Sequence, residues 1–269
     1  MQDNLEELLG VAQHAASVAA AVHRKALDGK VAVGTKSSPL DLVTAVDREA
    51  EQQLVITILD ARPFDAILGE EGTDLPGTSG VRWVIDPLDG TTNFVYGYPA
   101  HAVAVGVEID GKRVLGVVHD TYHDRVYSGI VGAGAQCAGK ELKVRDDGTL
   151  SRALICTGFL PALNVRDLQG DVLRRLLPHV RDVRRSGCPS LDLCAVAAGT
   201  LDGYYESGLG RWDITAGAAI AEAAGATVIE LHSDTLPDPL LVAANAQLIE
   251  ALVKALAEAG AIEQPRIKN

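Results

Sequence analysis

The order of hydrophobic and polar positions predicts a first half that begins with helices and continues into sheet. Alanine and leucine recur at helical spacing near the start of the chain, and again in a segment that Arg62-Pro63 ends. Alternating positions then predict antiparallel strands joined by short turns, of which Asp110-Gly111 is the clearest. The expected elements are helices over 5–27 and 47–61, a loop or hairpin over 31–42, strands over 65–68, 81–85, 102–109, 114–120 and 125–131, a surface loop over 73–80, and a short strand pair at 136–137 and 142–144.

In the second half the pattern changes to strands and helices in alternation, which indicates an α/β layer. Asp146-Asp147-Gly148 is the best candidate boundary, so we predict two halves, residues 1–147 and 148–269. The expected elements are strands over 153–157, 182–184, 203–206, 227–230 and 240–243, and helices over 168–179, 190–199, 212–224 and 246–259.

Composition narrows the class of protein. The chain has 269 residues, of which 47% are hydrophobic, and this is enough to bury a core. It has no apolar run of membrane-spanning length, and its acidic, polar start is unlike a signal peptide. Four scattered cysteines without a C-x-x-C pair argue against a zinc site or a disulfide framework, and they favour a reducing cytoplasm.

The formal net charge of −12 makes nucleic acid and anionic membranes poor partners. One basic cluster could attract such anionic partners locally, and its arginines are Arg174, Arg175, Arg181, Arg184 and Arg185. We interpret it as a solvated helix face with the strand that follows. Direct binding to nucleic acid or membranes is therefore not expected, although a small anion could still bind through a bridging cation.

The candidate chemistry lies where the strand over 81–85 ends. Asp86 and Asp89 are three residues apart with a proline between them, and Gly90 and two threonines follow where a helix can begin. Two carboxylates and a carbonyl at a strand end suit a hard divalent cation. Backbone N–H groups at a helix start suit a phosphate. An Asp-Gly turn that only closes the strand is the ordinary alternative, but the whole string favours a metal ion and a phosphoryl group held together.

Two further carboxylates could join this turn. Glu70 follows a strand and a glycine, and neighbouring strand ends would bring it close to Asp86, although Gly-Glu-Glu-Gly alone would be taken for a solvated loop. Asp213 begins a helix, where the commonest role of aspartate is the N-cap. Small residues after Asp213 would nevertheless let this helix pack closely and press its N-terminus into a cleft.

Together these segments resemble the inositol monophosphatase family of lithium-sensitive, magnesium-dependent phosphatases. The resemblance covers essentially the whole chain in order, and the matching strings are K-S-S-P-L-D-L-V-T-A-V-D, G-E-E, D-P-L-D-G-T-T-N-F, G-Y-Y-E and W-D-I-T-A-G. It implies a fold of the α+β to α/β class, a layered αβαβα sandwich of the type shared with fructose-1,6-bisphosphatase. It also implies a homodimer.

The resemblance assigns a role to each matching residue. Two to three Mg²⁺ ions per site would be held by Glu70, Asp86, the Leu88 carbonyl, Asp89 and Asp213. The attacking water would be positioned by Glu70 and Thr91, with Asp47 steadying the Thr91 hydroxyl. Substrate would contact Gly90, Thr91, Glu206, Ser190, Asp89 and Asp213. A flap that closes over the site would include Lys36 and Asp41.

We therefore expect a phosphomonoesterase that hydrolyses inositol 1-phosphate to myo-inositol and phosphate with metal-activated water. Glu206 after a Tyr-Tyr pair favours a neutral polyol. The alternatives within the same chemistry are a fructose-1,6-bisphosphatase, a histidinol-phosphatase or a 3′-phosphoadenosine 5′-phosphate phosphatase. An alternative from another class is a partner-binding regulator that kept the fold.

Overall fold

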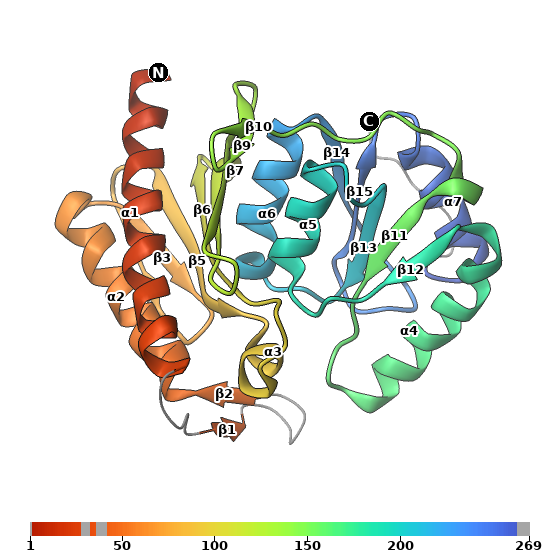
Figure 1. The fold of residues 1–269 in the computed structure, drawn as a ribbon, viewed down its shortest axis with the longest axis horizontal. Coiled ribbons are helices and arrows are strands. Elements are labelled where there is room, and N and C mark those ends of the chain that lie inside the picture. Colours follow the sequence, from red (N-terminus) through yellow and green to blue (C-terminus); the bar gives the residue numbers. More distant parts are fainter. Residues whose placement is uncertain (1, 28–32, 36–41, 263–269) are drawn as a thin grey trace.

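The structure, a computed structural model, describes residues 2–27, 33–35 and 42–262. Its elements stack as helices, sheet, helices, sheet and helices (Figure 1). One outer layer is α1 (Gln2–Leu27) with α2 (Ala45–Ala61), and the other is α4 (Leu163–Leu176) with α7 (Ile249–Glu258). The central layer is α5 (Pro189–Ala197) with α6 (Arg211–Ala223). The expected αβαβα sandwich is thus confirmed.

The first sheet is largely an antiparallel meander, as the alternating pattern predicted. Its order is β10-β9-β8-β7-β6-β5-β3-β4, and only β3 and β5 pair in parallel among its described strands. The bounds are β3 (Ala66–Gly69), β4 (Asp74–Leu75), β5 (Val81–Asp89), β6 (Ala102–Ile109), β7 (Lys112–Asp120), β8 (Arg125–Ile130), β9 (Gly134–Cys137) and β10 (Lys140–Glu141). A separate ribbon pairs β1 (Val33–Thr35) with β2 (Leu42–Thr44), and the six-residue α3 (Thr91–Tyr96) follows β5.

Two expectations for this sheet were wrong in detail. The strand that pairs with β9 is β10, not residues 142–144, because Ala138-Gly139 forms a tight turn with positive φ at both residues (49° and 75°) and returns the chain at once. Asp74-Leu75, expected within a loop, pairs with β3 as a two-residue edge strand.

The second sheet is mixed, with order β12-β11-β13-β15-β14. β11 is parallel to β12 and β13, whereas β15 is antiparallel to β13 and β14. The bounds are β11 (Leu154–Thr157), β12 (Asp182–Arg184), β13 (Gly203–Ser207), β14 (Ala226–Leu231) and β15 (Leu240–Asn245), and short 3₁₀ turns cover Leu150–Arg152 and Leu177–His179. The division of the chain at residues 147/148 stays a prediction.

In the second half of the chain, two helix starts differ from the expected ones by three residues or more. α4 begins at Leu163 rather than at residue 168, because its first turn is solvated and the apolar periodicity does not mark it. α7 begins at Ile249 rather than at residue 246, because the Asn245 side chain accepts hydrogen bonds from the amides of Gln247 and Leu248 and forms a turn there.

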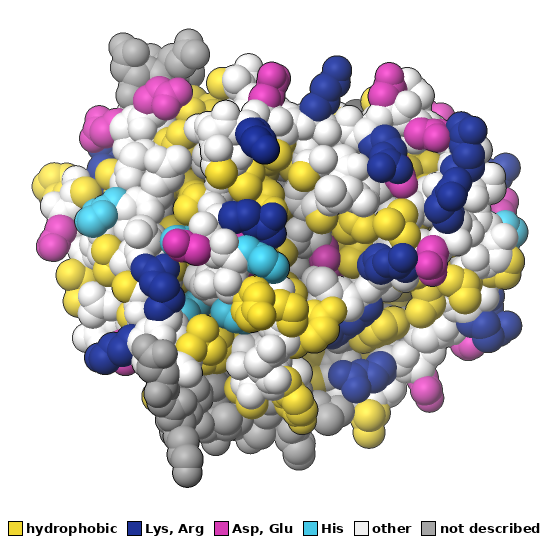
Figure 2. Space-filling view, in the orientation of Figure 1, with side chains coloured by type: hydrophobic (Ala, Val, Ile, Leu, Met, Phe, Trp, Pro, Cys, Tyr) yellow, Lys and Arg dark blue, Asp and Glu magenta, His cyan; other side chains and the backbone are white. Residues whose placement is uncertain are grey.

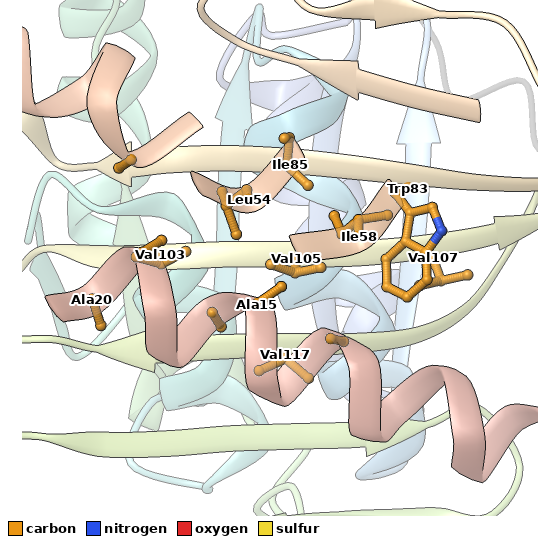
Figure 3. Packing of buried hydrophobic residues seen from close by; sticks show 14 of the residues in the cluster. Ala15, Ala20, Leu54, Ile58, Trp83, Ile85, Val103, Val105, Val107 and Val117 are labelled. Carbon is orange, nitrogen blue, oxygen red and sulfur yellow. The ribbon is translucent and has the colours of Figure 1, made fainter. Parts of the chain in front are cut away.

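The core between the first sheet and α1 and α2 holds β5 in place (Figure 3). Trp83 and Ile85 of β5 pack there with Leu54 and Ile58 of α2, and all four side chains are fully buried. The Trp83 indole N–H donates to the Asp65 carboxylate at 2.9 Å, so the buried ring keeps its polar partner. This packing fixes the direction in which β5 delivers its last residues.

On its other face the first sheet carries α6 at very short range. A Cβ built on Gly106 of β6 would lie 2.5 Å from Thr215, and one built on Gly116 of β7 would lie 2.1 Å from the Ala216 carbonyl oxygen. Both contacts are closer than a real Cβ allows, so the two glycines are required for this approach. The predicted close packing of this helix is therefore present, and it brings Asp213 up to the end of β5.

The helices, the cysteines and the surface arginines bear on the expected class of protein. None of the described helices has the length and hydropathy needed to cross a bilayer. The four cysteines, Cys137, Cys156, Cys188 and Cys194, are all free thiols. The arginines of the basic cluster are exposed, and two of them pair with acidic side chains, Arg174 with Asp171 and Arg184 with Asp182.

Candidate metal and phosphate site

Parallel pairing of β3 and β5 places Glu70 beside Asp86. Gly69 is the register partner of Ile85, so the next residue on each strand is a carboxylate. The Glu70 amide also donates to the Ile85 carbonyl at 3.3 Å. Burial, followed by the charge of Glu70, raises the pKa of Asp86 well above its ordinary value. The expected meeting of two neighbouring strand ends is thus found.

Three carboxylates converge at the end of β5. Asp86, Asp89 and Asp213 each offer one oxygen, and these atoms lie within 4.8 Å of one another. The pairing with β6 shifts between Asp86 and Asp89, so three steps on β5 match two on β6. Such a bulge re-aims side chains, and here it lets both aspartates of one strand take part. Asp213 comes from α6, more than a hundred residues later in the chain.

The ordinary interpretation of Asp213 as an N-cap is wrong. Gly210 is the N-cap of α6, and Asp213 lies three residues into the helix. Its Oδ2 accepts a hydrogen bond from the Gly210 amide at 2.7 Å. That contact ties one oxygen to the helix start, which is the N3 position of a capping interaction. Asp213 therefore combines this contact at the start of its own helix with a place in the carboxylate cluster.

Asp89 is held by the first turn of α5. Its Oδ2 accepts from the Ser190 amide at 2.7 Å, from the Ser190 hydroxyl at 2.5 Å and from the Cys188 thiol at 3.1 Å. Ser190 is fully buried, and the structure places its hydroxyl on this carboxylate. Its role as a substrate contact stays a prediction. Cys188 gave no signal in the sequence beyond being a cysteine outside any motif.

Thr91 opens α3 and bonds to α2. Its hydroxyl lies 3.0 Å from Asp47 Oδ1 and 3.1 Å from the Leu88 carbonyl, and the single proton can be donated to one of them at a time. Gly90 before it has φ of 86°, and a Cβ there would lie 2.8 Å from the Ala100 carbonyl oxygen. Glycine is therefore required for the turn that begins α3.

Glu206 lies on β13 and is buried, with 7% of its surface exposed. The Tyr204 hydroxyl donates to its Oε2 at 2.7 Å, and a Cβ on Gly158 would lie only 2.0 Å from the same oxygen. Burial raises the pKa of Glu206 to about 7, and the charge of Asp89 adds to this rise. The charge of Glu206 in turn contributes to the raised pKa of Asp213. Glu206, on the second sheet, is thus close enough to the carboxylate cluster for their charges to interact.

Two predicted residues are not described by the structure, and one residue near the site was not predicted. Lys36 and Asp41, expected in a flap, lie outside the described residues. His23 of α1 was not predicted, although its Nε2 lies 2.9 Å from the Pro87 carbonyl inside the carboxylate turn. Burial lowers its pKa to about 3, so the ring is neutral, and Nε2 must carry the proton because a carbonyl only accepts. The one available signal was a histidine on the apolar face of the first helix.

The residues present fit a divalent cation. Oδ2 of Asp86 is buried and receives no hydrogen bond from the described residues. Burial is the first cause of the raised pKa of Asp86, Asp89 and Asp213, and for Asp89 the raised value is about 6. Crowded carboxylates with a carbonyl nearby form an all-oxygen donor set, which hard cations such as Mg²⁺ prefer. A cation here would supply the positive charge that these side chains lack.

We expect the affinity for Mg²⁺ to rise between pH 5.5 and 7.5. The pKa of Asp89 is about 6, and those of Asp86 and Asp213 are also raised, so binding at the lower pH must displace protons. Each proton released would strengthen binding about tenfold per pH unit, because the metal binds only the carboxylate form. Calorimetry at both pH values, in buffers of different ionisation enthalpy, would count the protons. Equal dissociation constants with no proton release would contradict this expectation.

Comparison with known proteins gives one consistent result. Residues 4–261 match the inositol monophosphatase family. An inositol-1-monophosphatase of Mycobacterium bovis is 45% identical over an alignment of 241 residues, and the match covers 82% of this chain and 83% of that protein. A Nus factor SuhB of Pasteurella multocida is 35% identical over 223 residues, 81% of this chain and 84% of that protein. The crystal structure of the extragenic suppressor protein suhB from Bartonella henselae superimposes with a TM-score of 0.86 at 32% identity, covering 93% of this chain and 98% of that one.

Proposed function

This chain belongs to the inositol monophosphatase family, and on that premise we propose that it hydrolyses inositol 1-phosphate to myo-inositol and phosphate with bound Mg²⁺. The observation that carries the proposal is the convergence of Asp86, Asp89 and Asp213 beside Glu70, next to a threonine that bonds to a carboxylate. The relative named inositol-1-monophosphatase supports the choice of substrate.

Each residue of the site has a task in this proposal. Bound magnesium, two to three ions per site, would supply charge neutralisation and water activation, and its ligands would be Glu70, Asp86, the Leu88 carbonyl, Asp89 and Asp213. The Thr91 hydroxyl would accept a hydrogen bond from the attacking water while donating its own proton to Asp47. The amides of Gly90 and Thr91 would orient the phosphoryl oxygens.

The substrate's polyol would lie against Glu206. This carboxylate has one oxygen bound by Tyr204, so the other can accept a substrate hydroxyl. We expect Glu206→Gln to raise the KM for inositol 1-phosphate by about 10- to 100-fold, the value of a hydrogen bond to a charged group. Because the pKa of Glu206 is about 7, the assay is run at pH 8, where this carboxylate is mostly charged. A substrate without hydroxyls, 4-nitrophenyl phosphate, serves as the control, and an equal rise in its KM would contradict this contact.

The proposed substrate is tested by phosphate release across a panel. Purified protein is assayed with Mg²⁺, with and without Li⁺, on inositol 1-phosphate, fructose 1,6-bisphosphate, histidinol phosphate and 3′-phosphoadenosine 5′-phosphate. Preference for inositol 1-phosphate with inhibition by Li⁺ is the expected result. A higher kcat/KM on another member of the panel would replace the proposed substrate while leaving the reaction class in place.

A second candidate function is a regulatory role through a protein partner. The relative named Nus factor SuhB supports it. The net charge of −12, with basic and acidic side chains interspersed over the face in Figure 2, favours a protein partner over direct contact with nucleic acid. An Asp89→Asn variant that lost phosphatase activity but kept the cellular phenotype would support this role.

Two further properties belong to the proposal. The free thiols support a reducing, cytoplasmic location. The family resemblance supports a homodimer, and sedimentation at several concentrations would test it.

A further inference from the structure

Glu51 is a buried carboxylate that the proposed chemistry does not use. It lies on α2, one helical turn after Asp47, with 5% of its surface exposed. Its oxygens accept three hydrogen bonds from the loop that follows β3. Oε2 accepts from the Glu71 amide at 2.8 Å, and Oε1 accepts from the Thr73 amide at 3.1 Å and the Thr73 hydroxyl at 2.6 Å.

Glu51 contacts the backbone both before and after Glu70 in the sequence. On one side a Cβ built on Gly69 would lie 2.5 Å from Glu51 Oε2, so the backbone lies directly against this carboxylate. On the other side the amides of Glu71 and Thr73 are bound to it. The Gly69 amide also donates to the Thr73 carbonyl at 2.7 Å and closes the loop. The backbone that presents Glu70 is therefore fixed between the end of β3 and Glu51.

We propose that Glu51 is a positioning residue, which holds the loop over 69–73 so that Glu70 is presented to the metal site. The inference rests on the metal-dependent function proposed above. Asp47 and Glu51 are four residues apart on α2 and so share one helix face. Through Thr91 and Glu70 respectively, one helix would set the distance between the water-positioning hydroxyl and a metal ligand.

A neutral isostere cannot replace this carboxylate. The groups around it are two backbone N–H donors and one hydroxyl, and each needs an acceptor. Glutamine offers one acceptor oxygen, and its amide NH₂ would face a donor. Glu51→Gln should therefore release part of the loop while leaving the buried volume nearly unchanged.

The test compares Glu51→Gln with Glu49→Gln, the same change at an exposed position of the same helix. Mg²⁺ dissociation constants come from calorimetry, melting temperatures from the metal-free proteins, and kcat and KM from phosphate release. We expect Glu51→Gln to weaken Mg²⁺ binding by about 10- to 100-fold, as for other residues that support metal ligands. We expect Glu49→Gln to match the wild type. At saturating Mg²⁺ the KM for substrate should stay unchanged, because Glu51 does not contact substrate in this proposal.

A merely structural role predicts a different result. The metal-free melting temperature of Glu51→Gln would fall, while the folded protein would bind Mg²⁺ as the wild type does, and this outcome would overturn the proposal. If Glu51→Gln fails to fold, Thr73→Val removes only the hydroxyl contact, with about 2- to 10-fold weaker Mg²⁺ binding expected, and Thr73→Ser should restore it. Equal affinity in Thr73→Val and the wild type would then count against the proposal.

The same experiment separates this inference from the proposed function. If the wild type binds Mg²⁺ but hydrolyses no inositol phosphate, the substrate proposal fails, and the calorimetric comparison of Glu51 with Glu49 still decides the role of Glu51. If the wild type binds no Mg²⁺, both the positioning role and the metal-dependent function are overturned.

Discussion

Replacing Asp86 by asparagine is expected to abolish Mg²⁺-dependent phosphate release. Asp86 contributes to the carboxylate cluster, and its buried Oδ2 receives no hydrogen bond from the described part of the chain. The loss should exceed about 100-fold in kcat/KM, the upper end of the effect of residues that only support metal ligands. Phosphate release at increasing Mg²⁺ measures it. The matched control is Asp74→Asn, an exposed acid on the neighbouring edge strand β4.

The same substitution should stabilise the protein when no metal is present. The pKa of Asp86 is raised by burial and by Glu70, so the folded state holds its proton more tightly than the unfolded state does. That contribution to stability is complete at pH values below the unfolded pKa and is lost as pH rises through the folded pKa. Asparagine stays neutral and avoids the loss. Metal-free Asp86→Asn should therefore melt above the wild type at pH 7.5, with the difference shrinking toward pH 4.

Either of two results for Asp86→Asn, in phosphate release or in the metal-free melting temperature, would contradict the proposed role of Asp86. Retained activity in Asp86→Asn at any Mg²⁺ concentration would remove Asp86 from the proposed ligands. A lower metal-free melting temperature at pH 7.5 would mean that the carboxylate is compensated by contacts within the protein, and the case for a cation at this place would lose its main support.

Thr91→Val is expected to lower kcat by about 10²- to 10⁴-fold, the usual range for a group that takes part in proton transfer. The hydroxyl of Thr91 lies 3.0 Å from Asp47 Oδ1. Valine has nearly the same shape, with a methyl group in place of this hydroxyl. Metal ligation does not depend on this hydroxyl in the proposal, so the Mg²⁺ dissociation constant should change little. Single-turnover phosphate release and calorimetry measure the two effects separately.

The neighbouring residue provides the control for Thr91. Thr92 is exposed on the same turn, and Thr92→Val should leave kcat unchanged. Thr91→Ser keeps the hydroxyl and should recover most of the activity. If Thr91→Ser were as inactive as Thr91→Val, the methyl group would be the important part, and the proposed relay from water to Thr91 to Asp47 would be wrong.

The arrangement of Glu70 and Asp86 could be predicted because it depends on local order. Each carboxylate follows directly on a short apolar strand, and two strands that lie side by side bring their ends together. The support around Asp89 could not be predicted in the same way. Cys188 and Ser190 are about a hundred residues from Asp89 and belong to a helix in another layer, and neither occurs in a motif that specifies a contact.

Glu51 shows the same limit on a shorter scale. It is four residues from Asp47 on a helix whose existence was expected, but a glutamate at that spacing is ordinarily a solvated side chain. It is buried where α2 packs against β5 and the loop after β3, and the turn after β3 supplies donors that satisfy its charge.

The amino-acid order by itself determined the sequence of helices and strands, because periodicity is a property of neighbouring residues. Its motifs, through their resemblance to the inositol monophosphatase family, implied the layered fold and the carboxylates expected at the site. The tertiary structure alone decided how each oxygen is used. Asp213 bonds the start of its own helix, Ser190 bonds Asp89, and Glu51 bonds the loop that carries Glu70. Hydrogen bonds act over about 3 Å, so their partners are chosen by the approach of whole layers. For Asp213 that approach depends on Gly106 and Gly116, whose missing side chains let α6 lie against the sheet.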